Sequence, residues 1–124
     1  NNFLRDILTG GDIRIHGDGT ARRSYLYGSD AAWWTLVALV NGVDGATYNI
    51  GSPYPITHLE LVDLIGQRSR SKPRLLLNTA PSRLGIQDDL FPDTRFTQHS
   101  LGVVQTCSLE QTINKVWQWF SVNA

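Results

Sequence analysis

Residues 13–49 read IRIHGDGTARRSYLYGSDAAWWTLVALVNGVDGATYN, and this stretch decides the fold. Apolar and polar residues alternate on both sides of the Gly17-Asp18-Gly19 turn, which is the period-2 pattern of β-strands. An apolar helix follows, and a third short strand ends at Asn49. The stretch therefore predicts one strand-turn-strand-helix-strand unit, which is typical of an α/β fold.

The two strands around the turn have the pattern of a hairpin. Ile13 and Ile15 alternate with Arg14 and His16, and a second alternating run covers residues 23–27. An Asp-Gly pair between two such runs is a strong hairpin signal. The second strand is equally compatible with a different partner, so the sequence leaves its pairing open.

The helix after these strands is apolar on almost every side. Ser29 can cap it, Asp30 lies in its first turn, and Asn41-Gly42 provides its end. Residues 31–40 are nearly all apolar, and such a helix in a soluble protein packs on both sides. A chain this short offers little to cover both sides. We therefore expect the helix to meet a partner subunit or a domain that is absent here.

Other segments extend this unit into a small α/β domain with short strands and four or five helices. Capping boxes, in which the first residue and a Glu or Gln three positions later satisfy each other's amides, mark two helix starts. The remaining predicted elements are a helix ending at Thr9-Gly10-Gly11, a strand over Ala46–Ile50, a helix from Thr57 and Glu60 to about Gln67, a strand over Leu75–Leu77, a long loop over 79–92 and a last helix capped by Ser108 and Gln111 that buries a stripe from Leu109 to Phe120.

Length and charge limit the kind of partner. The 124 residues suit one domain, and 11 basic against 11 acidic residues give zero formal charge. A neutral chain has no electrostatic footprint for nucleic acid or an anionic membrane. The longest apolar run, Ala31 to Val40, is well short of the roughly 20 residues of a membrane span. A small molecule or a protein is the expected partner.

Composition argues against a metal site and against export. The chain has one cysteine, and its three histidines lack metal-ligand spacing. The first residues have neither a basic nor a continuous apolar region of a signal peptide, so we expect a cytoplasmic protein. Methionine is absent, which is consistent with a piece of something longer.

Few residues point to chemistry by themselves. The sequence has no Gly-rich fingerprint after a strand, no Walker loop, no nucleophile elbow and no Tyr-x-x-x-Lys pair. Arg23 is a candidate anion clamp, because a guanidinium binds phosphate through two parallel hydrogen bonds. The sequence is at least as compatible with a structural salt bridge of Arg23. His16, near the turn, fits a ligand contact or a surface histidine at a strand end.

Three further groups have a plain structural explanation that we favour. The basic run Arg68 to Arg74 is a phosphate strip or a solvated connection. Trp33-Trp34 can stack on a base, but in an apolar helix they are more typical of a core or an interface. Asp88-Asp89 can form an acid/base pair, but in a loop with Pro and Gly they are more typical of a solvated turn.

The order of the motifs is more specific. The sequence contains three motifs in a fixed order: GDGTARRSYLYGSD, then YNIGS, then LG followed by SLE. In this combination the chain resembles, over essentially all of its length, the C-terminal part of the extended short-chain dehydrogenase/reductase family. The resemblance is to the NAD-dependent nucleotide-sugar epimerases and dehydratases, such as dTDP-glucose 4,6-dehydratase, which include oxidoreductases, lyases and isomerases.

The resemblance implies four substrate-binding residues. Arg23, in RSYLY, matches the arginine that clamps the diphosphate of the nucleotide sugar, and Arg83, in SRLG, matches a second arginine that reaches the phosphates. Asn49, in YNIGS, matches an asparagine that lines the nucleotide pocket. His16, in IHG, stands where relatives usually have an aromatic residue near the base. Relatives often have basic residues after the SRLG motif, where this chain has Asp88 and Asp89.

The family motifs that this sequence lacks define its expected role. The family binds NAD on an N-terminal Rossmann half with a Gly-rich turn, and its catalytic Tyr and Lys lie in that half. This sequence contains neither the Gly-rich turn nor the Tyr-x-x-x-Lys pair. We therefore expect residues 1–124 to be a single C-terminal nucleotide-sugar-binding domain, with no catalytic residue and no bound cofactor, that associates with the Rossmann half and forms a homo-oligomer such as a dimer. The alternative is a non-catalytic module that self-associates through its apolar helix.

Overall fold

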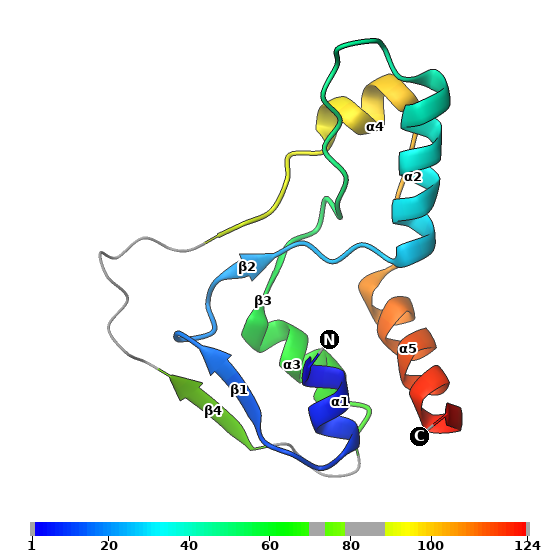
Figure 1. Ribbon diagram of the computed structural model, residues 1–124. Coiled ribbons are helices and arrows are strands. Elements are labelled where there is room, and N and C mark those ends of the chain that lie inside the picture. The colour runs from blue at the N-terminus through cyan, green and yellow to red at the C-terminus, as the bar shows by residue number, and fades with distance from the viewer. Residues whose placement is uncertain (1, 70–73, 79–88, 124) are drawn as a thin grey trace. The chain divides into compact units, whose positions relative to one another are not determined.

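The computed structural model describes residues 2–69, 74–78 and 89–123. These ranges contain helices α1 (Asn2–Leu8), α2 (Gly28–Asn41), α3 (His58–Gly66), α4 (Arg95–Leu101) and α5 (Leu109–Asn123), and strands β1 (Ile13–His16), β2 (Arg22–Arg23), β3 (Ile56–Thr57) and β4 (Leu75–Asn78) (Figure 1). Five helices and short strands confirm the predicted α/β class.

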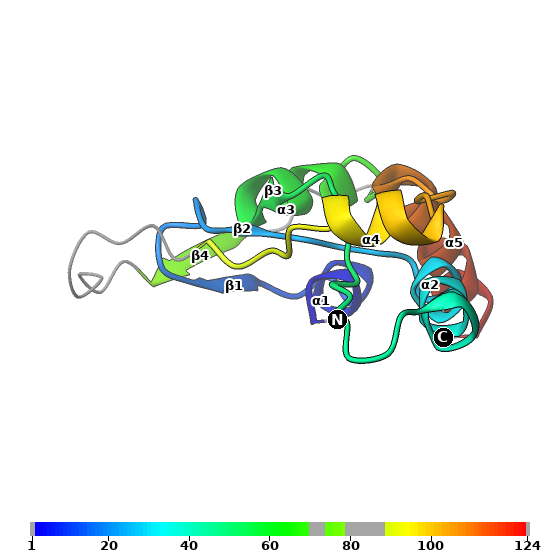
Figure 2. The ribbon, with the colours of Figure 1, turned by 90° about the horizontal axis from the view of Figure 1, so that it is seen from above.

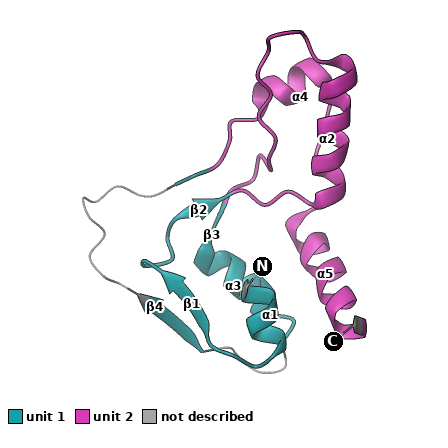
Figure 3. Ribbon diagram, viewed as in Figure 1, with its two compact units in different colours: residues 1–23, 56–90 teal, residues 24–55, 91–124 magenta. Residues whose placement is uncertain are grey.

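The chain forms two compact units (Figure 3). Unit 1 consists of residues 1–23 and 56–90, and unit 2 of residues 24–55 and 91–124. All four strands belong to unit 1, whereas α2, α4 and α5 belong to unit 2. The assignment of the whole chain to a single domain stays a prediction.

Strand pairing in unit 1 differs from the predicted hairpin. β1 pairs in parallel with β4, from Ile13 with Leu75 onwards, and β2 pairs antiparallel with β3. The connection between β1 and β2 covers residues 17–21, and within it Oδ1 of Asp18 accepts hydrogen bonds from the amide and the hydroxyl of Thr20. This Asx turn makes a wider connection than the two-residue turn of a tight hairpin. The second strand is also shorter than predicted, since only Arg22 and Arg23 form it.

The buried residues of unit 1 come from β1 and from two helices. Ile13 and Ile15 of β1 are buried, while Arg14 and His16 are exposed, as the alternating pattern predicted. α1 contacts both β1 and α3 (Figure 2). The helices contribute the apolar side chains Leu4, Ile7, Leu61, Val62 and Ile65 to the buried set.

Both predicted capping boxes are confirmed. In α3, the Thr57 hydroxyl accepts from the Glu60 amide over 3.1 Å, and the Glu60 carboxylate accepts from the Thr57 amide over 2.7 Å. In α5, the Ser108 hydroxyl and the Gln111 side chain exchange the same two hydrogen bonds with main-chain amides. The capping residues are three positions apart, so sequence spacing alone defines them.

The start of α2 corrects one prediction. The helix begins at Gly28, with Tyr27 in the N-cap position and no side-chain cap, so Ser29 is inside the helix and does not cap it. Asp30 lies in the first turn as predicted, and the helix ends at Asn41 before Gly42. The N-terminal amides of α2 therefore lack the side-chain acceptor that the sequence suggested.

The predicted strand over Ala46–Ile50 does not form in the described part of the chain. No strand is assigned to these residues, and Asn49 and Ile50 are exposed. The Tyr48 hydroxyl accepts a hydrogen bond from the Val43 amide, and the Tyr48 ring stacks on Phe96 with centroids 5.6 Å apart. A strand needs a partner backbone, and the described residues do not supply one here.

Only one side of α2 is covered among the described residues. Trp34 and Val37 form a core with Val103, and the Trp34 indole N–H donates to the Val104 carbonyl over 3.2 Å. The large apolar side chains that remain exposed on α2 are Trp33, Leu36, Leu39 and Val40. The predicted core helix α5 is also only partly covered: Ile113 is buried, but the other members of its stripe, Leu109, Val116, Trp117 and Phe120, are half-buried.

A buried carboxylate joins α2 to the segment before α5. Asp30 is 3% exposed, and it accepts hydrogen bonds from the amides of Thr106 and Cys107, each over 3.0 Å, and from the Thr106 hydroxyl. Burial raises the pKa of this carboxyl, but the hydrogen bonds from Thr106 and Cys107 outweigh burial and hold the pKa below its ordinary value. The charged form of Asp30 therefore stabilises unit 2.

We predict that Asp30→Asn destabilises the protein by about 1 to 3 kcal/mol at neutral pH, because the single amide oxygen cannot accept all three hydrogen bonds and those that remain lose the contribution of the negative charge. Since the folded-state pKa lies below the unfolded one, this contribution is present above the ordinary pKa of 3.8 and is lost as the pH falls through the folded-state value. Chemical denaturation from pH 7 to pH 3 measures it, with exposed Asp44→Asn as the control; equal stabilities of Asp30→Asn and the parent at pH 7 would contradict it.

Candidate functional site

Arg23 lies in β2 and is the last residue of the first segment of unit 1. Its backbone pairs with Ile56 of β3 on one side and forms a parallel bridge with Leu90 on the other. The side chain is half-buried, and its Nη1 donates to the main-chain carbonyl of Arg22 over 2.9 Å. The strand thus fixes the backbone of the predicted anion clamp on both sides.

The positive charge of Arg23 acts on His58, the first residue of α3. The ring of His58 packs edge-on against Phe3, with centroids 6.2 Å apart, and its buried Nδ1 has no hydrogen-bond partner among the described residues. Burial, followed by the positive charge of Arg23, lowers the pKa of His58 below its ordinary value. At neutral pH the imidazole is therefore uncharged and adds no repulsion to a cation that binds an anion.

The turn between β1 and β2 is fastened to the start of α3. The amide of Leu59 donates to the Gly19 carbonyl over 3.2 Å, and the amide of His58 donates to the Ala21 carbonyl over 3.3 Å. Gly19 has φ of 81°, and a Cβ there would lie 2.8 Å from Cγ of Leu59, so only glycine fits. The first amides of α3 are already used by the protein, and they do not form an open anion site.

His16 lies at the carboxyl end of β1. Its side chain is exposed, and its backbone is in register with Asn78, the last residue of β4. The carboxyl ends of parallel strands are the usual ligand-binding edge of an α/β sheet. Arg83 follows β4 in the sequence and lies outside the described residues. The structure therefore places His16 and Arg23 in unit 1 and leaves Arg83 as a sequence prediction.

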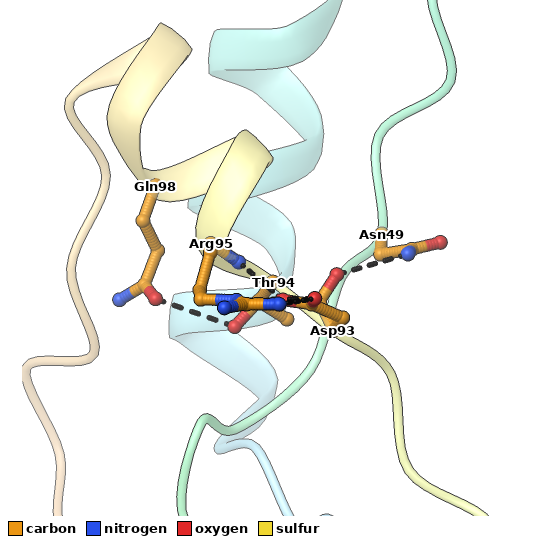
Figure 4. Close-up of polar contacts among 5 residues, drawn as sticks. All are labelled: Asn49, Asp93, Thr94, Arg95 and Gln98. Carbon is orange, nitrogen blue, oxygen red and sulfur yellow. Dashed lines mark hydrogen bonds and ion pairs between the residues drawn. The ribbon is translucent and has the colours of Figure 1, made fainter.

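Asn49 belongs to unit 2, where it joins a polar cluster (Figure 4). Its Nδ2 donates to the main-chain carbonyl of Asp93 over 2.9 Å. The Asp93 carboxylate accepts from the amide and the guanidinium of Arg95, and hydrogen bonds from this side chain lower the pKa of Asp93 to about 2. Thr94 donates to Gln98 beside this pair. Asn49 therefore holds the start of α4, in addition to any part in a pocket.

Two residues of unit 1 were not recognised from the sequence. His58 was interpreted only as part of a capping box, although the pairing of β3 with β2 brings it near Arg23. Asp89 was interpreted as part of a solvated turn, but its carboxylate forms an ion pair with Arg22 at 2.8 Å. Both contacts join segments far apart in the chain, and no local pattern signals them.

The other groups considered from sequence have simpler positions. Trp34 is fully buried and Trp33 is 58% exposed, so the pair does not form one stacking platform. In the basic run, Arg74 is exposed before β4, and residues 70–73 lie outside the described part. Within the described ranges no three His, Cys, Asp or Glu side chains gather as a metal site requires, and none of the helices has the length and apolar character of a membrane span.

The chain is similar to known proteins of one family. Residues 1–51 match the NAD dependent epimerase/dehydratase family. The resemblance that the sequence predicted is thereby confirmed: this chain is related to the NAD-dependent epimerases and dehydratases of nucleotide sugars. The relatives are much longer than the chain, which spans 28% to 38% of the first four curated ones.

Individual relatives act on nucleotide sugars, according to their names. UDP-glucuronic acid decarboxylase 1 of Danio rerio is 31% identical over 98% of this chain and 28% of its own length. dTDP-D-glucose 4,6-dehydratase of Mus musculus is 31% identical over 88% of this chain and 32% of its own length. UDP-glucose 4-epimerase of Thermotoga maritima, solved with UDP-glucose, matches the fold with a TM-score of 0.81 and 25% identity over 98% of this chain and 38% of that one.

Proposed function

We propose that this chain is the nucleotide-sugar-binding, C-terminal portion of an NAD-dependent sugar epimerase or 4,6-dehydratase. The observation that carries the proposal is the position of Arg23, which is half-buried in a strand that is paired on both sides. A guanidinium presents planar donors that match a diphosphate, and its fixed backbone limits the ordering cost of binding. The relatives named for UDP- and dTDP-sugars support this class of ligand.

Three further residues belong to the proposal on the strength of the resemblance alone. Arg83 would add a second contact to the phosphates, and His16, in unit 1, a contact to the nucleoside. Asn49 lies in unit 2, and its predicted contact to the nucleoside is proposed separately. Affinity for the diphosphate places the sugar, so that binding energy far from the reacting carbon is used for orientation. We propose that the whole protein is a cytoplasmic dimer in which catalysis belongs to the Rossmann half.

The glycine turn after β1 lacks the features of an NAD pyrophosphate site. A pyrophosphate site of the Rossmann type needs a Gly-rich turn that leads directly into a helix with unoccupied amides. The Gly17-Asp18-Gly19 turn leads into β2 instead, and carbonyls of residues 19 and 21 occupy the first amides of α3. We therefore propose that this chain binds substrate and not the cofactor, and that it has no turnover by itself.

Calorimetric titration with UDP, dTDP, CDP and GDP tests the proposal. We predict saturable binding of at least one nucleotide and a loss of roughly 10- to 100-fold in affinity in Arg23→Ala, since a hydrogen-bonded charge contributes about 1.5 to 3 kcal/mol. Arg14→Ala is the matched control, because Arg14 is exposed in β1 of the same unit. Absence of binding to all four nucleotides, or equal affinities of Arg23→Ala and the parent, would contradict the proposal for this chain.

The exposed face of α2 favours a second candidate function, a self-associating interaction module. Trp33, Leu36 and Val40 are 58%, 56% and 77% exposed and lie at helical spacing. A continuous apolar stripe is a common basis of association between chains. We predict that light scattering at micromolar concentration shows a dimer or a larger oligomer, and that Leu36→Glu shifts it to monomer while Thr35→Glu, away from the stripe, does not. A monomeric parent would exclude this candidate.

A further inference from the structure

Arg22, the residue before Arg23, forms hydrogen bonds with Asp89, which is distant in the sequence. The main-chain amide of Arg22 donates to Oδ1 of Asp89 over 2.8 Å, and its Nε and Nη2 donate to Oδ2 over 2.9 and 2.8 Å. One carboxylate thus accepts three hydrogen bonds from a single residue. These hydrogen bonds, the side-chain ones first, lower the pKa of Asp89, which keeps the carboxylate charged at neutral pH.

Leu90, the residue after Asp89, also contacts β2, so residues 89–90 and β2 form a junction. The amide of Leu90 donates to the Arg22 carbonyl over 3.2 Å, and Arg23 forms a parallel bridge with Leu90. The same Arg22 carbonyl accepts the hydrogen bond from Nη1 of Arg23. A single carbonyl group therefore serves both the junction with residues 89–90 and the guanidinium of the proposed anion clamp.

Stability alone does not account well for this arrangement. The side chains of Arg22 and Asp89 are 44% and 19% exposed, and ion pairs that water reaches contribute little to folding. An arginine side chain loses rotamer entropy when a ligand fixes it, and each donor that is already held in place reduces the part that remains to be lost on ligand binding. Fixing the Arg22 carbonyl fixes one of the donors of Arg23.

We propose that Asp89 is a positioning residue for nucleoside diphosphate binding. Its hydrogen bonds to Arg22 hold the main-chain carbonyl of Arg22 in place, and this carbonyl orients the guanidinium of Arg23. This inference rests on the proposed function and extends it to a residue that the sequence pattern assigned to a solvated turn. Asp89 acts through Arg23 and does not itself touch the ligand. Its effect on affinity must therefore disappear when the Arg23 guanidinium is removed.

A double-mutant cycle with UDP tests this dependence. The variants are Asp89→Asn, Arg23→Ala and the double substitution, with affinities taken from NMR titrations that extend to millimolar UDP. We expect Asp89→Asn to weaken binding roughly 5- to 10-fold in the parent and to have no further effect in Arg23→Ala, which is the non-additivity of coupled residues. Asp6→Asn is the matched control, because Asp6 pairs with Arg5 in the same unit and is expected to leave affinity unchanged.

The possible outcomes separate this inference from the proposed function. Unchanged or tighter binding by Asp89→Asn, with Arg23→Ala impaired, overturns the inference and leaves the proposed function in place. Equal losses in both backgrounds overturn it as well, because a general structural role acts regardless of Arg23; thermal unfolding of each variant identifies that role. A parent that does not bind UDP, dTDP, CDP or GDP overturns the proposed function and this inference together.

Discussion

The main chain of Arg22 is the connection on which unit 1 depends. Its amide bonds to Asp89, its carbonyl accepts from Leu90 and from Arg23, and its strand pairs with Thr57 of β3. Strands of two to four residues supply few ladder hydrogen bonds, so each such contact represents a large share of what holds the strands in place. Arg23 owes its position to these contacts.

Unit 2 uses a buried charge for a similar purpose. Asp30 is a buried residue in the first turn of α2, and it accepts three hydrogen bonds from Thr106 and Cys107. These bonds join the helix to the segment that leads into α5. Trp34, fully buried one turn later, adds its own bond to the Val104 carbonyl. These polar contacts hold the covered face of α2, whereas its opposite face remains exposed among the described residues.

The sequence predicted features that depend on neighbouring residues. Both capping boxes, the end of α2 at Asn41 and the buried alternation of Ile13 and Ile15 all follow from spacings of four residues or fewer. Strand pairing could not be predicted in this way, because the partners of β1 and β2 lie far along the chain. The strand expected at Ala46–Ile50 failed for the same reason: its pattern suits a sheet, but the described residues provide no neighbour.

The candidate site shows the same division. Arg23 is predicted as an anion clamp because a guanidinium binds phosphate through two parallel hydrogen bonds and because the motif order resembles a family. His58 and Asp89 were missed because the effect of the Arg23 charge on His58 and the ion pair of Asp89 with Arg22 arise only after β2 has paired with β3 and with residue 90. Asn49 has a structural contact with Asp93 that its motif did not indicate.

The most direct test of the account is to map the binding of UDP by two-dimensional NMR, with the His58 ring as a reporter. If Arg23 holds the diphosphate, resonances of the β2 amides and of the His58 imidazole shift on saturation, and the His58 pKa rises from its lowered value as the neighbouring positive charge is neutralised. Shifts confined to α5, or an unchanged His58 at saturating UDP, would contradict the claim that Arg23 in β2 is the anion clamp.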